Sequence, residues 1–429
     1  MNDAPDAAAR TGPLRHTVVI DLTQHLAGPF ATQILGDLGA RVIKIEPPEG
    51  DSTRVIGPHF ADGDSAYYLS VNRNKESVCI NLKTDAGRDA LLALVGSADA
   101  VIENFRPGTM EKLSIGADVL RAVNPNLVVT SLTGFGLDGP YRDRPAFDMI
   151  VQALGGGMSL TGEIGGRPVR SGLPIGDLCA GMNAAIATLA GLLRAAQDGV
   201  GSRVDVAMLD TQVSLLSYVA SYYLSSGQVP GLQGRQHMSI PTYRAFTCGD
   251  GKDIVVTANT PRMWVGLCHA LEVTDLLADP RFTTSEDRRV HATDLAAALE
   301  PAALRLASTE LLARLAEQGV PSAPINGVDA TLADPHVRAR GMVVEQRRGT
   351  DPVHAVGDPL KISDPRAAHV VPPRLGQDTE EVLRTLGGLG AARVRTLAAE
   401  GAIGPARPDR RTPRDTSQDT EHGTPARSA

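Results

Sequence analysis

The sequence predicts an α/β protein in which a Rossmann-like large domain with a parallel sheet is joined to a smaller α+β domain. Through the first half of the chain, short apolar runs alternate with amphipathic helical patterns, which is typical of parallel strands covered by helices. After a glycine-rich stretch at residues 227–234, the pattern changes to short strands followed by helices. A length of 429 residues also exceeds what one hydrophobic core usually holds, so two domains are expected.

The first domain is predicted element by element from these runs. A strand, a helix and a second strand lie between Val18 and Arg54, in the order of a Rossmann-like unit. In chain order we expect strands at 17–22, 41–46, 100–104, 127–132 and 203–208, and helices at 29–39, 85–95, 178–196 and 210–225. The last of these helices ends the domain.

The remaining segments complete the predicted organisation. Beyond the glycine-rich stretch we expect strands at 243–247 and 253–257 and helices at 263–271, 292–315 and 383–399. This gives a disordered N-terminus at 1–15, a large domain at 16–224, a small domain at 225–325, a return to the large domain at 326–400 and a disordered tail at 401–429. The tail has mixed charge and no aromatic residue, so it cannot bury enough apolar surface to offset its chain entropy.

The composition excludes several classes of protein. A net charge of -7, with only seven Phe, seven Tyr and one Trp, argues against a nucleic-acid surface. Cysteines stand far apart without ligand spacing, so we expect reduced thiols and no metal site, at Cys79, Cys179, Cys248 and Cys268. Without an apolar signal segment or ~20 uninterrupted apolar residues, a soluble cytoplasmic protein is expected. The sequence also lacks Walker A, HExxH, GxSxG and EF-hand motifs.

The turn of the first strand–helix unit reads Gln24-His25-Leu26-Ala27-Gly28-Pro29. A dinucleotide fingerprint, G-x-G-x-x-G, needs three glycines to bring backbone against a pyrophosphate. Here a single glycine is followed by a proline that begins the helix. The unit is therefore predicted to hold part of a ligand other than a dinucleotide.

Asp177 is the candidate for chemistry, because it lies between a glycine-containing loop and a strongly apolar helix. Composition alone favours an N-cap, which is worth ~1 kcal/mol through hydrogen bonds from free backbone N–H groups. The alternative is a nucleophile: the positive helix end would keep the carboxylate ionised while apolar surroundings remove its water. An ionised, poorly solvated carboxylate can attack an activated acyl group.

Four blocks of sequence resemble the class III CoA-transferases of the CaiB/BaiF type, the family of formyl-CoA transferase and carnitine CoA-transferase. They are IDLTQHLAGPFATQILGDLGARVIKIEPPEGD, SVNRNKESVCINLKT, VIENFRPGTMEKL, and SLTGFGLDGPYRDRPAFDMIVQALGG running on to RSGLPIGDLCAG. The later stretches RQHMSIPTYRAF and PSAPINGVDATLADPHVRARGMVVE are also similar to the family. The resemblance covers roughly residues 16–395 in order.

The resemblance implies roles for particular residues. Asp177 matches the family's catalytic aspartate. Positions that match CoA contacts are Leu26, Ala27, Val71, Asn72, Arg73, Asn74, Asn104, Phe105, Arg106 and Lys112. Of these, Arg73, Arg106 and Lys112 could meet phosphates, although each is equally well explained as a solvated surface charge.

The family's chemistry implies transfer of CoA from an acyl-CoA thioester to a free carboxylic acid, through a mixed anhydride and an aspartyl-CoA thioester on Asp177. CoA thioester is then a substrate, and no permanently bound cofactor, ATP or metal is implied. The family also implies a ring-shaped chain that forms an interlocked homodimer. Acyl-CoA and a small carboxylic acid are the expected partners, with no nucleic acid or membrane.

Two alternatives stay open. Acyl-CoA racemases of the same fold place a His-Asp pair where this chain has Phe147-Asp148, so the second acid or base of a racemase is missing. Asp148 could orient groups in the site or simply begin a helix. The other alternative is a CoA-binding protein without turnover, against which the matching segment around Asp177 argues.

The resemblance also bears on the substrate. Formyl-CoA transferase has a glutamine where this chain has Leu26, and a compact glycine run where this chain spaces Gly227, Gly231 and Gly234 widely. Formate or oxalate is therefore disfavoured. The segment from His237 to Tyr243 is more similar to members that use larger acids, including dicarboxylates with succinyl-CoA as donor, although an ordinary loop leading into a strand explains it equally.

Overall fold

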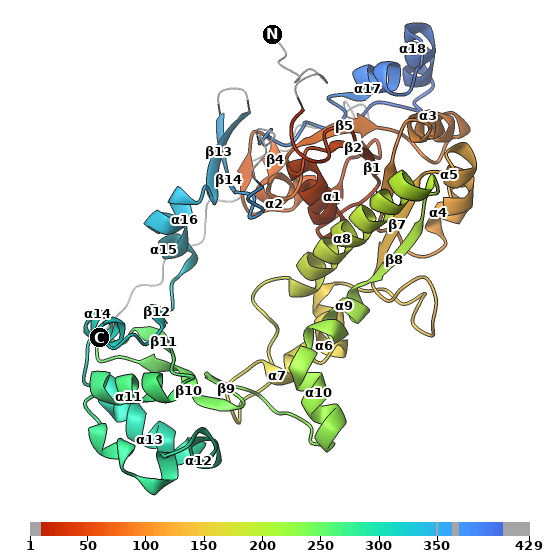
Figure 1. Cartoon of the computed structure of the whole chain (residues 1–429). Coiled ribbons are helices and arrows are strands. Elements are labelled where there is room, and N and C mark those ends of the chain that lie inside the picture. The colour runs from red at the N-terminus through yellow and green to blue at the C-terminus, as the bar shows by residue number, and fades with distance from the viewer. Residues whose placement is uncertain (1–9, 349–350, 363–368, 406–429) are drawn as a thin grey trace, which may run out of the picture.

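The large domain is built on a six-stranded parallel sheet in the computed structural model, which describes residues 10–348, 351–362 and 369–405 (Figure 1). The strand order is β5-β2-β1-β6-β7-β8, and every neighbouring pair is parallel. The strands are β1 (Val18–Asp21), β2 (Arg41–Glu46), β5 (Lys75–Cys79), β6 (Ala100–Glu103), β7 (Val128–Thr133) and β8 (Arg203–Ala207). The predicted parallel sheet is confirmed.

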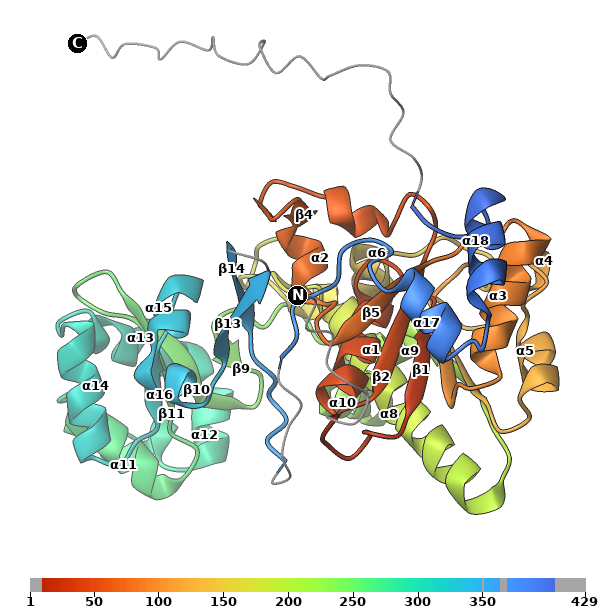
Figure 2. The same cartoon turned by 90° about the horizontal axis from the view of Figure 1, so that it is seen from above.

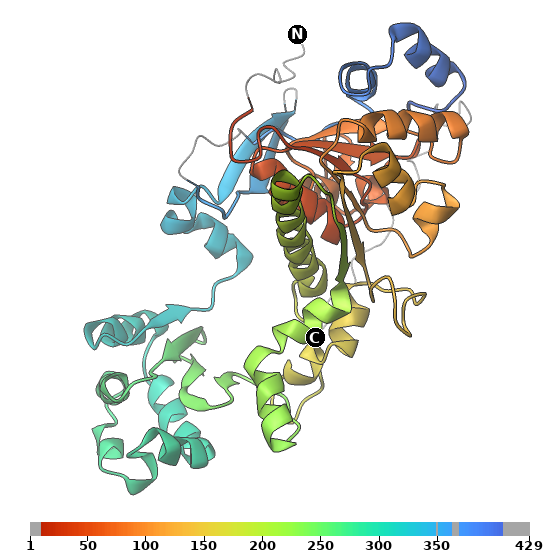
Figure 3. The same ribbon diagram turned by 45° about the vertical axis from the view of Figure 1, so that its right-hand side comes forward.

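Helices cover both faces of this sheet, because alternate strand residues point to opposite sides. Val19 packs in the core below α1 and α8, whereas the next residue, Ile20, packs in the core below α3, α5, α17 and α18. The long helix α8 crosses one face of the sheet in Figure 3. The helices are α1 (Ala27–Asp37), α3 (Asp85–Val95), α5 (Ala117–Val123), α8 (Ile175–Asp198), α17 (Thr379–Thr385) and α18 (Ala391–Ala399).

Shorter elements follow the strand ends. They are η2 (Ser52–Val55), β3 (Phe60–Ala61), β4 (Asp64–Ser65), α2 (Ala66–Ser70), α4 (Thr109–Lys112), α6 (Asp148–Leu154), α7 (Gly157–Leu160), α9 (Met208–Leu215) and α10 (Ser217–Ser226). The predicted helix at 210–225 is divided into α9 and α10 at Ser217, whose φ is +46°. Because both helices are rich in apolar residues, the apolar pattern of the sequence runs on across Ser217 and predicts a single helix.

The small domain packs helices against a four-stranded antiparallel sheet of order β12-β11-β10-β9. Its strands are β9 (Gln236–His237), β10 (Ile240–Thr247), β11 (Asp253–Thr257) and β12 (Ser322–Pro324). Its helices are α11 (Pro261–Ala270), η3 (Thr274–Leu277), η4 (Pro280–Phe282), α12 (Ser285–Val290), α13 (Ala292–Ala303) and α14 (Ser308–Glu317). The predicted helix at 292–315 is thus two helices, and the extended residue Ala307 precedes the second.

The chain leaves the large domain through α10 and returns by a separate path, so its ribbon follows a ring-like course in Figure 1. The return consists of α15 (Val328–Ala333), α16 (Pro335–Ala339) and the hairpin of β13 (Val343–Arg348) and β14 (Asp351–Val356). Figure 2 shows this hairpin between the two domains. The predicted helix at 383–399 is α17 and α18, and it does return to the large domain.

Both described ends of the chain are attached to the large domain, although disorder was predicted at 1–15 and 401–429. Arg10 forms an ion pair with Glu76, and Ile403 forms an isolated antiparallel bridge with Ile80, beside the edge strand β5. The rest of these two predictions, at 1–9 and 406–429, falls outside the described residues.

Within the described residues, α8 is the one helix whose length and composition would allow it to cross a membrane. Core helices of soluble proteins satisfy the same criterion. One face of α8 packs in the core through Ala180 and Ala184, while Met182 and Ile186 on another face are exposed. Packing against the sheet therefore explains part of its apolar character.

Candidate active site

The turn between β1 and α1 rests on a buried network of charges. Asp21 is fully buried at the end of β1 and accepts hydrogen bonds from the Thr23 backbone N–H (2.9 Å), the Thr32 hydroxyl (2.7 Å) and the Lys75 ammonium (3.0 Å). Lys75 also donates to the Pro29 carbonyl at 3.0 Å. These bonds hold both ends of the turn in place.

The same network shifts the pKa values of its members. Burial alone would raise the pKa of Asp21, but the charges of Lys75 and Lys44 hold it below its usual value. Burial lowers the pKa of Lys75 to about 8 in spite of the neighbouring Asp21. Lys44 donates to the Thr23 carbonyl at 2.8 Å and pairs with Asp51 at 2.9 Å, so a second buried lysine supports the turn.

Asn104 fixes the turn from the neighbouring strand β6. Its side-chain oxygen accepts from the Gln24 N–H and its amide donates to the Gln24 carbonyl, both at 2.8 Å. One residue later, His25 adopts a φ of +67°. Leu26 is the N-cap residue of α1, and it and Ala27 are buried. The predicted contact residues Leu26, Ala27 and Asn104 are thus brought together.

The predicted contact segment from Val71 to Asn74 is buried after α2. The Arg73 guanidinium forms a bidentate pair with Asp37 at 2.6 and 2.8 Å and donates to the Val356 carbonyl at 2.7 Å. A contact between Arg73 and a phosphate would require this pair to open. The geometry therefore disfavours the predicted phosphate contact of Arg73, whose interactions are structural.

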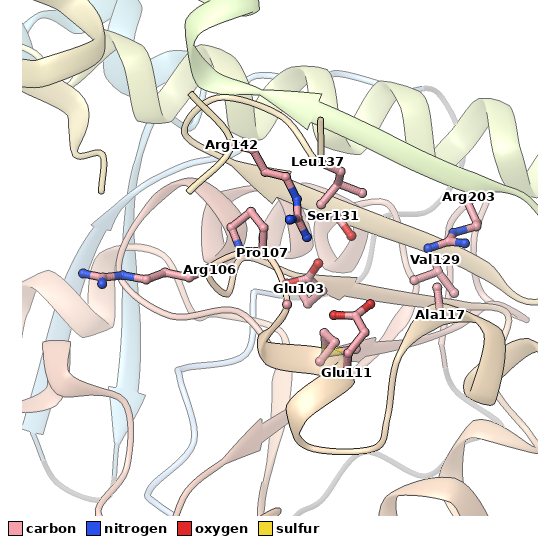
Figure 4. Close-up of a pocket in the computed structure, with 12 residues that line it drawn as sticks. Glu103, Arg106, Pro107, Glu111, Ala117, Val129, Ser131, Leu137, Arg142 and Arg203 are labelled. Atoms are coloured by element: carbon pink, nitrogen blue, oxygen red, sulfur yellow. The ribbon is translucent and has the colours of Figure 1, made fainter. Parts of the chain in front are cut away.

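Arg106 and Lys112 are exposed, as a phosphate contact requires. A cavity of about 150 Å³ lies beside the segment from Glu103 to Glu111, and Figure 4 shows the carboxylates of these two residues facing it. Its lining also includes Arg106, Arg142 and Arg203. Burial raises the pKa of Glu103 to about 7, and its Oε2 accepts from the Phe105 N–H at 2.8 Å. The lining thus combines two carboxyl groups with guanidinium groups, and Arg106 is in addition exposed to solvent, where a phosphate could reach it.

Asp177 does not cap its helix. Pro174 is the N-cap residue of α8, and no side-chain cap hydrogen bond is formed there. The N-cap hypothesis is therefore wrong. Asp148 instead accepts a 2.8 Å hydrogen bond from the Gly176 N–H through Oδ1 and one of 2.7 Å from the Gln152 amide through Oδ2. Asp148 thus begins α6 and also holds the first turn of α8.

Burial, and then the negative charge of Asp148, raise the pKa of Asp177 to about 7. The positive helix N-terminus alone would keep this carboxylate ionised, but burial outweighs that effect. Tyr67 lies within electrostatic range of Asp177, since burial and then the charge of Asp177 raise the pKa of its phenol to about 12. Sequence reasoning missed Tyr67, because nothing in the stretch DSAYYLS distinguishes it from the fully buried Tyr68.

The turn and the aspartate meet at α8. Gly181 lies one helical turn after Asp177, and a Cβ there would stand 2.5 Å from the Ala27 carbonyl oxygen. On the other side of the turn, the His25 ring meets the Phe147 ring edge to face, with centroids 6.4 Å apart. The turn therefore contacts α8 one helical turn from Asp177, the Asp148 carboxylate at the start of α6 binds the residue before it, and Tyr67 lies within electrostatic range. Within the described residues, no group of three or more His, Cys, Asp or Glu is placed to hold a metal ion.

The chain is similar to known proteins over most of its length. The family model for CoA-transferase family III matches residues 14–379. The succinate–glutarate CoA-transferase of Agrobacterium fabrum is 37% identical over 90% of this chain and 98% of its own, and the acetyl-CoA:oxalate CoA-transferase of Acetobacter aceti is 37% identical over 82% and 90%. A CAIB/BAIF family protein from Brucella suis has a similar crystal structure, with a TM-score of 0.80 and 35% identity over 88% of this chain and 100% of that chain.

Proposed function

The chain belongs to CoA-transferase family III, whose enzymes transfer CoA between acyl-CoA thioesters and carboxylic acids, and we propose that Asp177 is the nucleophile of that transfer. The observation that carries the proposal is a half-buried carboxylate with a pKa of about 7, placed where α8 meets the β1–α1 turn. A carboxylate with little hydration is more nucleophilic than one in water, and with a pKa of about 7 roughly half of it is ionised at neutral pH.

The reaction needs no proton transfer to balance. The Asp177 carboxylate attacks the thioester carbonyl, the C–S bond breaks, and CoA thiolate leaves behind a mixed anhydride. The thiolate then attacks the Asp177 carbonyl, the C–O bond breaks, and the donor acid leaves as a carboxylate. An acceptor carboxylate attacks the resulting aspartyl-CoA thioester, and the released thiolate finally attacks the new acyl carbonyl. The products are the new acyl-CoA and the free Asp177 carboxylate.

Two neighbours would support these steps. Asp148 keeps the first turn of α8 in place through the Gly176 N–H, and its charge raises the basicity of Asp177. Tyr67 stays protonated far above neutral pH, so its hydroxyl can donate a hydrogen bond to an oxygen that gains negative charge during attack. Arg106 and Lys112, both exposed, are the proposed phosphate contacts of CoA.

For the acceptor we propose a dicarboxylic acid, with succinyl-CoA as donor. The relatives named above act on succinate, glutarate and oxalate, which are all dicarboxylic. Leu26 stands where formyl-CoA transferase has a glutamine, and its side chain is buried within the turn. The loss of that polar group supports an acid longer than oxalate.

An interlocked homodimer and a cytoplasmic location complete the proposal. The ring-like course of the chain would allow a partner to pass through it, and exposed apolar residues on α8 would then be covered, including Met182, Ile186 and Leu193. The four cysteines are free, which supports a reducing compartment. A stable monomer by light scattering would contradict the dimer.

The test is substitution of Asp177 combined with direct detection of the intermediate. Asp177→Asn and Asp177→Ala should abolish CoA transfer in a mass-spectrometric screen of CoA esters against small acids. Asp198→Asn, at the exposed end of the same helix, is the matched control and should remain active. In the wild type, hydroxylamine should trap the aspartyl thioester on Asp177. Full activity of either Asp177 variant would refute the nucleophile.

A further inference from the structure

His25 has an unfavourable backbone conformation for a residue with a side chain. Its φ of +67° lies in the left-handed region, which glycine enters without cost and which His enters only occasionally. Such strain is retained mainly at functional sites. Because a glycine at this position would suit the backbone better, the structure suggests that the imidazole itself has a use.

The imidazole is available to a ligand. His25 is exposed, and within the described residues neither ring nitrogen has a hydrogen-bond partner. Its only ring contact there is the edge-to-face one with Phe147, which is 67% exposed. The polar ring of His25 and the apolar ring of Phe147 thus lie side by side and exposed, and together they are called the wall.

Both residues of this wall are connected to the helical turn that carries Asp177. Phe147 immediately precedes Asp148, which holds Gly176, and Gly176 immediately precedes Asp177. On the same turn as His25, the Ala27 carbonyl meets α8 at Gly181, one helical turn from Asp177. Phe147 is therefore connected to the residue before Asp177, and the turn of His25 to the residue four positions after it.

The lysine and arginine side chains near the turn are already paired. Arg73 is paired with Asp37, while Lys44 and Lys75 are buried in ion pairs below the turn. The side chains next to the imidazole are apolar: Leu26, the following residue, is buried, and Phe147, whose ring it contacts, is exposed. A nitrogen donor in an otherwise apolar wall is suited to one oxygen-bearing group at a distance from the reacting carbonyl.

We propose that His25 is a specificity-determining residue that binds the second carboxylate of a dicarboxylic substrate, the one that takes no part in CoA transfer, while Phe147 packs against the methylene chain. This inference rests on the proposed function. A monocarboxylic acid uses its single carboxylate for chemistry and has no group for His25, so the residue distinguishes acids by their second charge.

The experiment compares acids of equal length with one or two carboxylates. For the purified enzyme, kcat/KM is measured with succinate, glutarate and adipate and with butyrate, valerate and hexanoate. His25→Gly suits the backbone and removes the ring, whereas His25→Asn keeps a short polar group. Both variants should lose about ten- to hundredfold in kcat/KM for the dicarboxylates, the usual effect of losing a hydrogen bond to a charged group, and little for the monocarboxylates.

Glu272→Gly is the matched control, because Glu272 also has a positive φ, of +57°, but lies in the small domain. It should leave the preference unchanged. An equal loss with both series, or a raised KM for the CoA ester alone, would show that His25 serves the turn or CoA and would overturn the inference. A wild type that transfers CoA to no acid refutes the proposed function as well, whereas an active wild type with an unaltered preference in both variants refutes this inference alone.

Discussion

The Asp148 carboxylate accepts a 2.8 Å hydrogen bond from the Gly176 backbone N–H, one residue before Asp177. A single side chain thereby satisfies a free donor in the first turn of α8 and places a negative charge beside the nucleophile. These two effects can be separated, because an amide can accept the hydrogen bond without carrying the charge.

Asp148→Asn should move the pH profile. Asparagine can still accept from the Gly176 N–H through its oxygen, although its NH2 group cannot accept from Gln152. Loss of the charge lowers the pKa of Asp177 from about 7 toward its ordinary value. The acid limb of kcat/KM should therefore shift to lower pH by roughly half a unit to one unit. An unmoved limb would contradict the electrostatic role. Asp148→Ala removes the hydrogen bond too, and should lower the free energy of unfolding by about 1 kcal/mol.

Asp177→Asn should stabilise the fold while removing activity. The folded-state pKa of about 7 lies above the unfolded value near 3.8, so the ionised carboxylate destabilises the folded protein. That penalty is full above pH 7 and disappears as the pH falls from 7 to 4. At pH 8, urea unfolding should show a gain on the order of 1–3 kcal/mol, allowing for partial exposure of the site, and almost none at pH 4.

Gly181→Ala should separate the turn from α8. Its new Cβ would stand 2.5 Å from the Ala27 carbonyl oxygen, and backbone atoms cannot move aside cheaply. We expect a several-fold higher KM for acyl-CoA and a loss of stability of about 1–3 kcal/mol. Gly231→Ala is the control, because a Cβ there would meet no described atom within 4 Å. Similar behaviour of the two variants would contradict the close approach.

The basic residues should divide into two kinds. Arg106→Ala and Lys112→Ala should raise the KM for acyl-CoA, most strongly at low salt, and leave the unfolding free energy within about 0.5 kcal/mol of the wild type. Arg73→Ala should instead destabilise the protein by about 3–5 kcal/mol, because it leaves Asp37 buried without its partner. Urea unfolding and kinetics at two salt concentrations check both statements. If Arg73→Ala raised the KM for acyl-CoA without lowering the free energy of unfolding, Arg73 would be a phosphate contact after all.

The strands that the sequence predicts well are those made of continuous apolar runs. The predicted 41–46 matches β2, and 100–104 exceeds β6 by one residue, because both strands are buried between two layers of helices. The edge strand β5 was missed, because its Lys75, Glu76 and Ser77 look like surface residues. Their partners lie elsewhere in the chain, as Lys75 meets Asp21 and the Ser77 N–H meets Asp378. Only the tertiary structure makes these residues part of a sheet.

The site shows the same division between local and distant information. The sequence context identifies Asp177, but the side chain that accepts from the first turn of α8 is Asp148, which lies 28 residues before its partner Gly176. A local pattern therefore assigns the cap to Asp177 itself. Arg73 was predicted as a phosphate contact, because the pattern SVNRN cannot reveal that Asp37 is within reach. His25 and Tyr67 carry no local signal. The ring contact of His25 with Phe147 and the electrostatic effect of Asp177 on Tyr67 arise only when the turn, α2, α6 and α8 are assembled.

The attachment of the chain's last described residues to β5 has a consequence for biosynthesis. The Asn81 N–H donates to the Ala402 carbonyl and Ile403 bridges to Ile80, so the edge of the large domain is completed by residues made more than 300 positions later. The small domain, by contrast, runs without interruption from β9 to β12. During synthesis, the small domain can fold before the large domain is complete. A nascent chain that stops before residue 400 would leave the edge of the large domain's sheet exposed to other chains.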